Sequence, residues 1–387
     1  MTGYPKLVVS FPESLSNIRQ EELDALVDDD HPFLNYGFLQ ALEQSDCVCR
    51  TTGWQPHHFA LRTESGDLVA FAPFYLKYHS YGEYVFDWSW AEAYAKHGLD
   101  YYPKLVSSIP FTPTTSSRLL LDTELGIDTA CCELFHQAVE QHCAKQQLSS
   151  AHVLFPSQTE DARVLYQGWM KREGVQYHWF NKAYADFDDF LSSLNANKRK
   201  NIRKERKRLL SEGLQYYWRS ALELSQLERE CFFSCYKRTY NVRGQMPYLN
   251  ETFFDLIFKR LGEQCLLLFA NDGAGRPIAS ALYLQGKNTL YGRYWGALED
   301  VPCLHFELCY YAGIERCIEL GLNRFDAGAQ GEHKLLRGFE PVATQSFHYI
   351  RHPEFRGAID QFLSSEREYI EQYREDAKSW LPYKLHA

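Results

Sequence analysis

A dense group of acidic and aromatic side chains lies between residues 79 and 104. Side chains alternate between the two faces of a strand, so a strand over 83–90 would put Glu83 and Asp87 on one face. Acids beside tyrosine and tryptophan are typical of a pocket for an amine, although an exposed sheet face with solvated acids gives the same pattern. We expect Asp87 to be the base that takes a proton from an amine, and Glu92 either to act beside it or to offset a helix dipole. The binding residues expected around them are His79, Tyr81, Glu83, Trp90 and Lys104.

A second group of candidates lies in the C-terminal half of the chain. Arg293 occupies the place that Glu83 has in the first group, and the reversed charge predicts that the two groups bind different molecules. Lys334 follows a predicted strand at 323–327, and the end of such a strand is a common place for site residues. We expect Lys334 to steady an oxyanion or a phosphate. The other binding candidates are Tyr294, with a core position as the alternative, Glu307, with a solvated position as the alternative, and Glu332.

A strongly basic segment, 195–208, interrupts an otherwise acidic chain. It holds eight basic residues and one acidic residue, whereas the whole chain has a formal net charge of -9. Like charges three and four residues apart weaken a helix, so this composition favours a polyanionic partner. The alternative is a solvated, highly charged helix that connects two halves of the chain. The residues expected to grip phosphate groups are Lys198, Arg199, Lys200, Arg203 and Lys204.

Several other kinds of chemistry lack their sequence patterns. Neither the GxSxG motif of serine hydrolases nor the HExxH motif of zinc proteases occurs. His57 and His58 are neighbours on a predicted strand, so their side chains point to opposite faces and predict no metal site. The 11 cysteines show no CxxC spacing, which is typical of reduced thiols. No apolar run is long enough to cross a membrane and no signal peptide is recognised, so we expect a cytoplasmic protein.

The elements that must position these residues follow an α/β pattern that occurs twice. Each of two predicted hairpins is followed by a strand, a helix and another strand. Tyr81-Gly-Glu-Tyr84 and Tyr291-Gly-Arg-Tyr294 lie at similar distances beyond the two hairpin turns. We therefore expect two copies of one α/β unit with mixed sheets, over residues 1–185 and 186–387, with the basic helix opening the second copy. Further helices are predicted at 159–169 and, mostly polar, at 353–381.

Six motifs are spread over nearly the whole chain. They are His31-Pro-Phe-Leu34, Gly53-Trp-Gln-Pro-His-His58, the stretch His79–Trp90, Gly98-Leu-Asp-Tyr-Tyr-Pro-Lys-Leu105, the stretch Asn197–Arg206, and Phe325-Asp-Ala-Gly-Ala-Gln-Gly-Glu-His-Lys334. With these motifs the chain resembles the FemAB-like branch of the GNAT acyltransferase superfamily, described as peptidoglycan biosynthesis or recognition proteins. The resemblance implies two GNAT-like domains in tandem with a cleft between them. It also implies transfer of an aminoacyl group from a charged tRNA to an amine, with the basic helix and the cleft receiving the nucleic acid or a phosphorylated precursor.

The acyl donor is the least defined part of this expectation. Enzymes of the superfamily that use acetyl-CoA hold its pyrophosphate with an Arg/Gln-x-x-Gly-x-Gly/Ala loop before a helix, and this chain has no such loop. Three functions stay open. The leading one is an aminoacyl- or acyltransferase with a tRNA-like carrier, a small amine acceptor, no tightly bound cofactor and no metal. The others are an acyltransferase that uses acyl-CoA or an acyl carrier, and a non-catalytic nucleic-acid-binding protein of the same fold.

Overall fold

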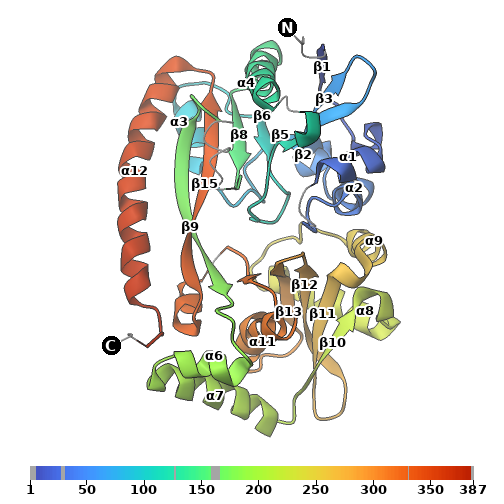
Figure 1. Cartoon of the computed structure of the whole chain (residues 1–387), viewed down its shortest axis with the longest axis vertical. Coiled ribbons are helices and arrows are strands. Elements are labelled where there is room, and N and C mark those ends of the chain that lie inside the picture. The colour runs from blue at the N-terminus through green and yellow to red at the C-terminus, as the bar shows by residue number, and fades with distance from the viewer. Residues whose placement is uncertain (1–5, 28–30, 126–127, 158–165, 330, 385–387) are drawn as a thin grey trace. The chain divides into compact units, whose positions relative to one another are not determined.

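The computed structural model describes residues 6–27, 31–125, 128–157, 166–329 and 331–384 (Figure 1). The chain forms two compact units, each built from two separate segments. The first unit holds Met1–Gly174 and Ala343–Gln372, and the second holds Val175–Val342 and Tyr373–Ala387. Part of the C-terminal segment therefore belongs to the same unit as the N-terminal segment. The expected division near residue 185 concerned two copies in the sequence and stays a prediction.

Two β-sheets form the centre of the first unit. One is antiparallel, in the order β1 (Leu7–Ser10), β3 (Phe59–Thr63), β4 (Leu68–Ala72) and β7 (Leu120–Leu121). The other runs in the order β15 (Glu340–Ile350), β8 (Ser150–Leu154), β6 (Lys104–Ser107), β5 (Phe74–Lys77) and β2 (Trp54–Pro56). In the second sheet only β6 and β8 are parallel to each other, and the other neighbouring pairs are antiparallel.

The helices of the first unit are α1 (Gln20–Leu26), α2 (Tyr36–Gln44), α3 (Trp88–Lys96) and α4 (Asp128–Lys145). Helix α4 shows why this segment is helical and where it packs. Its apolar residues Phe135, Val139 and Cys143 recur every four positions and so share one face of the helix. They are fully buried with Phe59 of β3 and Phe74 of β5, and this contact forms the main core of the unit.

Neighbouring strands of a mixed sheet form the centre of the second unit. Their order is β9 (Met170–Phe180), β14 (Arg324–Asp326), β13 (Thr289–Ala297), β12 (Pro277–Gln285), β11 (Cys265–Asn271) and β10 (Gln215–Ser220). Strands β13 and β14 are parallel, and the other neighbouring pairs are antiparallel. The hairpin that the sequence predicts over β11 and β12 is confirmed.

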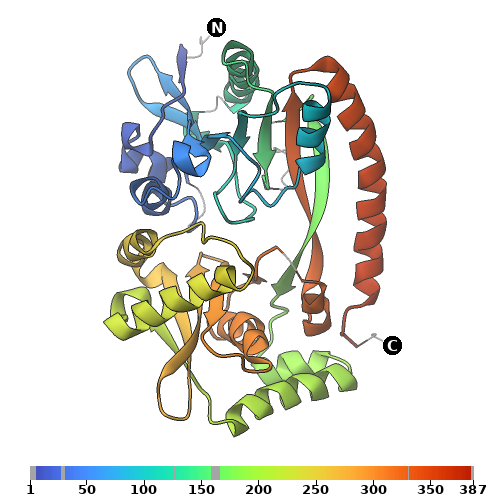
Figure 2. The same cartoon turned by 180° about the vertical axis from the view of Figure 1, so that it is seen from behind.

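The helices of the second unit are α6 (Phe187–Ser193), α7 (Ala196–Ser211), α8 (Gln226–Asn241), α9 (Glu251–Leu261) and α11 (Ala312–Glu319). Helix α11 continues a short α10 (Leu304–Phe306) and a π-helical turn, η6 (Glu307–Tyr311). Helix α8 lies so close to β13 that a Cβ atom on Gly296 would come within 2.0 Å of the carbonyl oxygen of Cys235. Helices α6 and α7 lie side by side in both views (Figure 1 and Figure 2), joined by an ion pair between Asp188 and Arg203.

The two units use the same arrangement of strands around their parallel pairs. In the first unit β6 leads through α4 to its parallel partner β8, and in the second unit β13 leads through α10 and α11 to its parallel partner β14. Each later strand also has an antiparallel neighbour, β15 for β8 and β9 for β14. Both of these neighbours come from the segments where the chain changes unit. Helix α12 (Pro353–Ser379) follows β15.

The predicted strand over residues 83–90 is wrong. The residues up to Asp87 form an irregular loop between β5 and α3, and Trp88 begins the helix. Gly82 and Tyr84 have φ angles of 81° and 63°, and such left-handed backbone cannot continue an extended strand. The argument that Glu83 and Asp87 share one face of a strand therefore fails, although the loop brings them together in another way.

Two other sequence-based expectations concern local structure. The similar tetrapeptides differ in conformation, because 81–84 lies in this loop whereas 291–294 lies in β13. The helix predicted at 159–169 falls largely on residues outside the described part of the chain. Among the helices that the structure describes, none is both long enough and apolar enough to cross a membrane.

Candidate functional site

A cavity lies in the second unit where the parallel strands β13 and β14 separate. The two strands pair only over residues 289–291 and 324–326, after which β14 ends and β13 continues to Ala297. The cavity has a volume of about 100 Å³, and we call it the β13–β14 cavity. It is lined by residues 281–283 of β12, residues 292–295 of β13, and His305, Cys309, Tyr310 and Ala327.

An irregularity in β13 shapes the wall of this cavity. Ala281 pairs with Trp295 and Leu282 with Arg293, so Tyr294 is one extra residue on β13. Its φ angle is 53°, in the left-handed region that a residue with a side chain rarely adopts. Such a bulge bends a strand and redirects its side chains, and bulges are frequent beside active sites. The bulge therefore shapes β13 at the residues that line the cavity.

Buried charges fix the loop that follows β14. Two nitrogens of Arg293 donate to the two carboxylate oxygens of Asp326, at 3.2 and 2.9 Å, and both side chains are almost fully buried. Although burial alone would raise the pKa of Asp326, the Arg293 guanidinium holds it well below its usual range. Asp326 also accepts a hydrogen bond from the backbone N–H of Gly328 at 2.8 Å. The ion pair thus ties the start of the loop to β13.

Lys334 holds the same loop from the other side. It lies in the short helix η7 (Glu332–Arg337) and is 1% exposed. Its ammonium donates to the carbonyl oxygens of Ala327, at 2.9 Å, and Gly328, at 2.6 Å. Burial lowers the pKa of Lys334 to about 8, so the side chain carries a charge at neutral pH that is less strongly held than that of a surface lysine.

Three cavity residues with reactive side chains come from the helical segment after β13. Burial lowers the pKa of His305 to about 4, so its imidazole is neutral at pH 7 and available as a proton acceptor, although it is a weaker base than an unburied histidine. The hydroxyl of Tyr310 and Nε2 of His333 are hydrogen-bonded at 2.8 Å. Cys309 is the third. Sequence reasoning missed all three, because the sequence pattern of a helix gives no sign of the π-helical turn that carries Cys309 and Tyr310.

A second hollow in this unit adjoins the cavity. It has a volume of about 310 Å³ and shares Trp295 and His305 with the cavity, and the rest of its lining comes from the end of β13, the loop that follows and α10. This loop carries Glu299 and Asp300, whose carboxylates lie 3.8 and 3.9 Å from Arg276 and Arg238. A loop with two acidic side chains is a poor place for a pyrophosphate.

The basic segment forms the single helix α7, which has two different faces. Asn195 begins the helix by accepting a hydrogen bond from the backbone N–H of Lys198. Ile202 and Leu209 are buried, and on the same side Arg206 pairs with Glu307. The opposite side carries four exposed basic residues at i, i+3, i+4 and i+7 spacing, which we call the basic stripe: Lys200, Arg203, Lys204 and Lys207.

The basic stripe keeps most of its charge available. Arg203 pairs with the exposed Asp188, at 2.7 Å. For the three lysines of the stripe, no ion pair forms with any described residue. Lys198 and Arg199 are half-buried at the start of the helix, and Arg199 donates to the carbonyl oxygen of Leu194. Of the five expected phosphate ligands, the stripe therefore presents Lys200, Arg203 and Lys204, and it adds Lys207.

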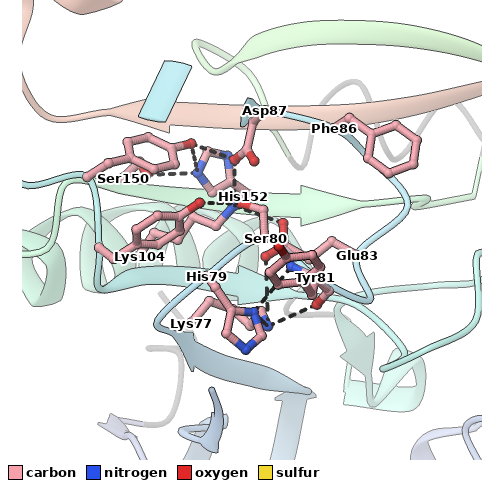
Figure 3. Close-up of polar contacts among 12 residues, drawn as sticks. Lys77, His79, Ser80, Tyr81, Glu83, Phe86, Asp87, Lys104, Ser150 and His152 are labelled. Atoms are coloured by element: carbon pink, nitrogen blue, oxygen red, sulfur yellow. Dashed lines mark hydrogen bonds and ion pairs between the residues drawn. The ribbon is translucent and has the colours of Figure 1, made fainter. Parts of the chain in front are cut away.

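The first unit contains a closed cluster of buried charges, drawn in Figure 3. The ammonium of Lys104 donates to Glu83 at 2.8 Å, to Asp87 at 2.5 Å and to Ser80 at 2.8 Å. The hydroxyl of Tyr101 donates to Asp87 at 2.6 Å. The strand-end position of Lys104 and the irregular loop after β5 bring these groups together.

The acids of this cluster differ in how they hold a proton. Lys104 keeps the pKa of Asp87 well below its usual range, against the effect of burial, so Asp87 is a weak base. Burial raises the pKa of Glu83 to about 7, and Glu83 Oε1 has no hydrogen-bond partner among the described residues. A second buried lysine, Lys77, lies 4.0 Å from this oxygen, and burial lowers its pKa to about 6. Glu83 thus has the proton affinity that the sequence analysis expected of Asp87.

The other predicted site residues differ in how far they are exposed to solvent. Glu92 is exposed in α3 and pairs with Lys96 at 2.9 Å, whereas Trp90 is buried in the same helix. Tyr81 is exposed, and its ring meets His79 and Trp88 edge to face. Glu332 accepts a hydrogen bond from Tyr373. Within the described residues, no group of three His, Cys, Asp or Glu side chains is arranged to hold a metal ion.

Comparisons with known proteins place the chain in a family. The model of the FemAB-like family, described as peptidoglycan biosynthesis/recognition, matches residues 14–385. Two solved structures share the fold at 12% identity: FemX, with a TM-score of 0.53 over 89% of this chain and 98% of that one, and the C-terminal domain of a putative lysylphosphatidylglycerol synthetase from Agrobacterium fabrum, with a TM-score of 0.51 over 91% and 97%. A tandem GNAT protein of clavulanic acid biosynthesis, 10% identical, has a TM-score of 0.47 over 90% and 99%. No curated protein matches.

These matches confirm the expected fold class at the level of a mixed α/β fold with mixed sheets. They also confirm the resemblance that the six sequence motifs indicated. The family model covers almost the entire chain. The chain belongs to the FemAB-like family.

Proposed function

We propose that this protein is an acyltransferase that moves an aminoacyl or acyl group from a carrier to an amine. Membership of a family described by peptidoglycan biosynthesis or recognition supports this, as does the fold shared with FemX and with a putative lysylphosphatidylglycerol synthetase. On this proposal the acceptor is an amine of cell-wall or lipid synthesis, and the protein works in the cytoplasm. The acyl group would be transferred in the second unit.

The observation that carries the proposal is the β13–β14 cavity. Acyl transfer to an amine needs a dry pocket for the acyl group, a group that accepts the amine proton, and positive charge near the developing oxyanion. The early separation of β13 and β14 supplies a small pocket between strands. Its volume of about 100 Å³ suits an aminoacyl or short acyl group.

The residues around the cavity suggest a role for each requirement. His305 lines it with a neutral imidazole and would take the proton from the attacking amine. Arg293 lines it within its ion pair with Asp326, and the part of its positive charge that Asp326 does not neutralise would stabilise negative charge on the carbonyl oxygen. Lys334 would act through its hold on Ala327 and Gly328, by keeping the loop after β14 in place. In this proposal, a role in positioning replaces the direct role on an oxyanion or a phosphate that we expected for Lys334.

The basic stripe of α7 would bind the phosphate groups of the carrier. Four exposed basic side chains on one helix face are spaced to follow a phosphate backbone, and three of them are lysines without an ion pair to a described residue. We therefore propose charged tRNA as the donor, with its aminoacyl end in the cavity. An acyl-CoA donor is the alternative, and the acids Glu299 and Asp300 in the loop before α10 disfavour it.

The site residues predicted in the first unit have no role in this proposal. Asp87, Glu92, Glu83 and Lys104 are not among the residues of the β13–β14 cavity. Their predicted roles in catalysis and in amine binding stay predictions. If the first unit binds the acceptor amine, Glu83 is better suited than Asp87 to exchange a proton near neutral pH.

Binding of tRNA at increasing salt concentration tests the proposed donor. We expect the variant K200Q/K204Q/K207Q to bind bulk aminoacylated tRNA more weakly than the wild type. Because three phosphate contacts would be lost, the negative slope of log K against log salt should become shallower by about 2 to 3. The matched control K237Q/K259Q/K287Q makes the same charge change at exposed lysines of the same unit and should keep the wild-type slope. Equal slopes for the two triple variants would contradict the tRNA proposal.

A further inference from the structure

The inner face of α7 is joined by ion pairs to the helical segment that forms one wall of the cavity. The guanidinium of Arg206 donates to both oxygens of Glu307, at 3.1 and 2.9 Å, and to Glu315 at 2.7 Å. Its planar group also lies 4.6 Å from the ring centre of Phe187. Glu307 is only 1% exposed, so this contact is inside the unit rather than on its surface.

A second connection runs from the neighbouring residue of α7. Glu205 accepts a hydrogen bond from the hydroxyl of Tyr311. The same hydroxyl accepts one from Arg337 at 2.9 Å, and the Arg337 guanidinium lies 3.4 Å from Glu205. Tyr311 is also almost fully buried. Two consecutive residues of α7 therefore each hold a buried polar group of the facing helix.

The two held groups mark the ends of the π-helical turn η6. Glu307 is its first residue and Tyr311 its last, and Cys309 and Tyr310 between them line the β13–β14 cavity. A π-helical turn contains one residue more than an ordinary α-helical turn and is rare, often occurring at functional sites. If the turn relaxed to a regular α-helix, the side chains within it would rotate by up to about 100°, the angle between successive helix positions. Cys309 and Tyr310 would then leave the cavity wall.

We propose that Arg206 and Glu205 are positioning residues that hold η6 in its π-helical form and thereby keep Cys309 and Tyr310 in the cavity wall. The inference rests on the proposed function only where it treats the cavity as the acyl pocket. The contacts of Arg206 and Glu205 with η6 do not depend on that function. It gives α7 two roles. The basic stripe on the outer face would receive the carrier, and the inner face would maintain the pocket that receives the acyl group.

The test compares R206Q with R203Q in the full-length protein. Both variants remove one positive charge from α7, but Arg203 pairs only with the exposed Asp188 among the described residues. We expect R206Q to increase amide hydrogen exchange in the segment 304–312 at least fivefold and to change the alkylation rate of Cys309 by iodoacetamide, measured on its own peptide. We expect R203Q to match the wild type in hydrogen exchange and in alkylation, and R206K to recover part of the protection from exchange that R206Q loses.

Y311F is the second variant, in case R206Q does not fold. It removes one hydroxyl that joins Glu205 and Arg337 and should increase exchange in the same segment. Wild-type exchange in both R206Q and Y311F would overturn the proposal. Faster exchange spread evenly over β10, β11 and β12 would overturn it too, because that result means general loss of stability.

A transfer assay separates this inference from the proposed function. We expect R206Q to lower kcat at least tenfold with the KM for charged tRNA unchanged, whereas K200Q/K204Q/K207Q should raise KM. An unchanged kcat in R206Q would overturn the positioning role. If the wild type transfers nothing, the proposed function fails, and the exchange and alkylation results still decide whether Arg206 holds the turn.

Discussion

Burial moves the proton affinities of Glu83 and Lys77 in opposite directions. The pKa of Glu83 rises from 4.5 to about 7, and that of Lys77 falls from 10.5 to about 6. Both changes favour the neutral form, because the interior of the first unit solvates charge poorly. Asp87 escapes this effect because Lys104 lies against it. Glu83 and Asp87, four residues apart, thus have pKa values shifted in opposite directions, because Lys104 stabilises the charge of Asp87 more strongly than that of Glu83.

The raised pKa of Glu83 predicts how stability depends on pH. Between pH 4.5 and 7 the folded chain keeps a proton on Glu83 that the unfolded chain releases, so this group costs more stability as the pH rises. E83Q removes that titration. We therefore expect the free energy of unfolding of E83Q, relative to the wild type, to increase from pH 4.5 to pH 7 and then to level off. Urea denaturation in steps of half a pH unit measures it.

E92Q is the matched control for this prediction. Glu92 is a glutamate of the same unit, exposed and paired with Lys96 on the surface. Its difference from the wild type should stay flat over the same range, because surface pairs contribute little. A flat difference for E83Q as well would show that Glu83 titrates normally in the folded protein.

For single residues, the sequence predicted correctly that certain charged side chains lie together, but it gave the wrong local structure as the reason. Glu83, Asp87 and Lys104 do lie together, because they are close in the chain and flank a strand end. The predicted strand was wrong, since the left-handed backbone of Gly82 and Tyr84 depends on a particular loop that periodicity does not reveal. His305 was missed because a single histidine in a helix gives no signal until the strands that it faces are placed.

At the scale of elements, close packing between α8 and β13 fixes the strand that carries the cavity. Gly296 has no Cβ atom, which allows the backbone of Cys235 to approach it. The hydroxyl of Thr239 in α8 donates to the carbonyl oxygen of Trp295 at 2.8 Å, beside this contact. The helix thus supports β13 directly after its bulge. We expect any change that separates the two elements to affect the cavity.

Substitution of Gly296 tests this packing. In G296A the new methyl group would meet the carbonyl oxygen of Cys235 at 2.0 Å, so helix or strand must move. Overpacking of this kind should lower the free energy of unfolding by about 3 kcal/mol. G273A is the control, since a Cβ atom there meets nothing within 4 Å, and it should stay within about 0.5 kcal/mol of the wild type. Equal stability of the two variants in chemical denaturation would contradict the close approach.

At the scale of the whole molecule, the two units exchange segments of chain. Strand β15 pairs with β8 of the first unit, although nearly 200 residues separate them in sequence. Phe347 of β15 is buried in the core with Phe135 and stacks on Tyr166 at 4.8 Å. Pairing between distant strands leaves no local signal in the sequence. The sequence therefore gave no indication that a C-terminal strand completes the first unit.

The assignment of β15 to the first unit predicts which unit responds to a substitution in the C-terminal part of the chain. F347A should create a cavity in the first unit and destabilise it by about 3–5 kcal/mol. Amide hydrogen exchange should then increase in β3, α4 and β8, while β11 and β12 of the second unit keep their protection. F325A is the counterpart, because Phe325 is fully buried in the core of the second unit and should give the reverse pattern. Increased exchange in the second unit alone for F347A would contradict the assignment of β15.

The most direct test of the account is transfer itself. Wild-type protein is incubated with aminoacylated tRNA carrying a labelled amino acid and with a cell-wall precursor fraction that has free amines, and the labelled amide product is measured. We expect transfer by the wild type, and about a hundredfold lower turnover in H305A with unchanged tRNA binding, because the variant loses the group that accepts the proton. Absence of transfer by the wild type from both aminoacylated tRNA and acyl-CoA, or equal turnover in H305A, would contradict the claim that the second unit transfers acyl groups in the β13–β14 cavity.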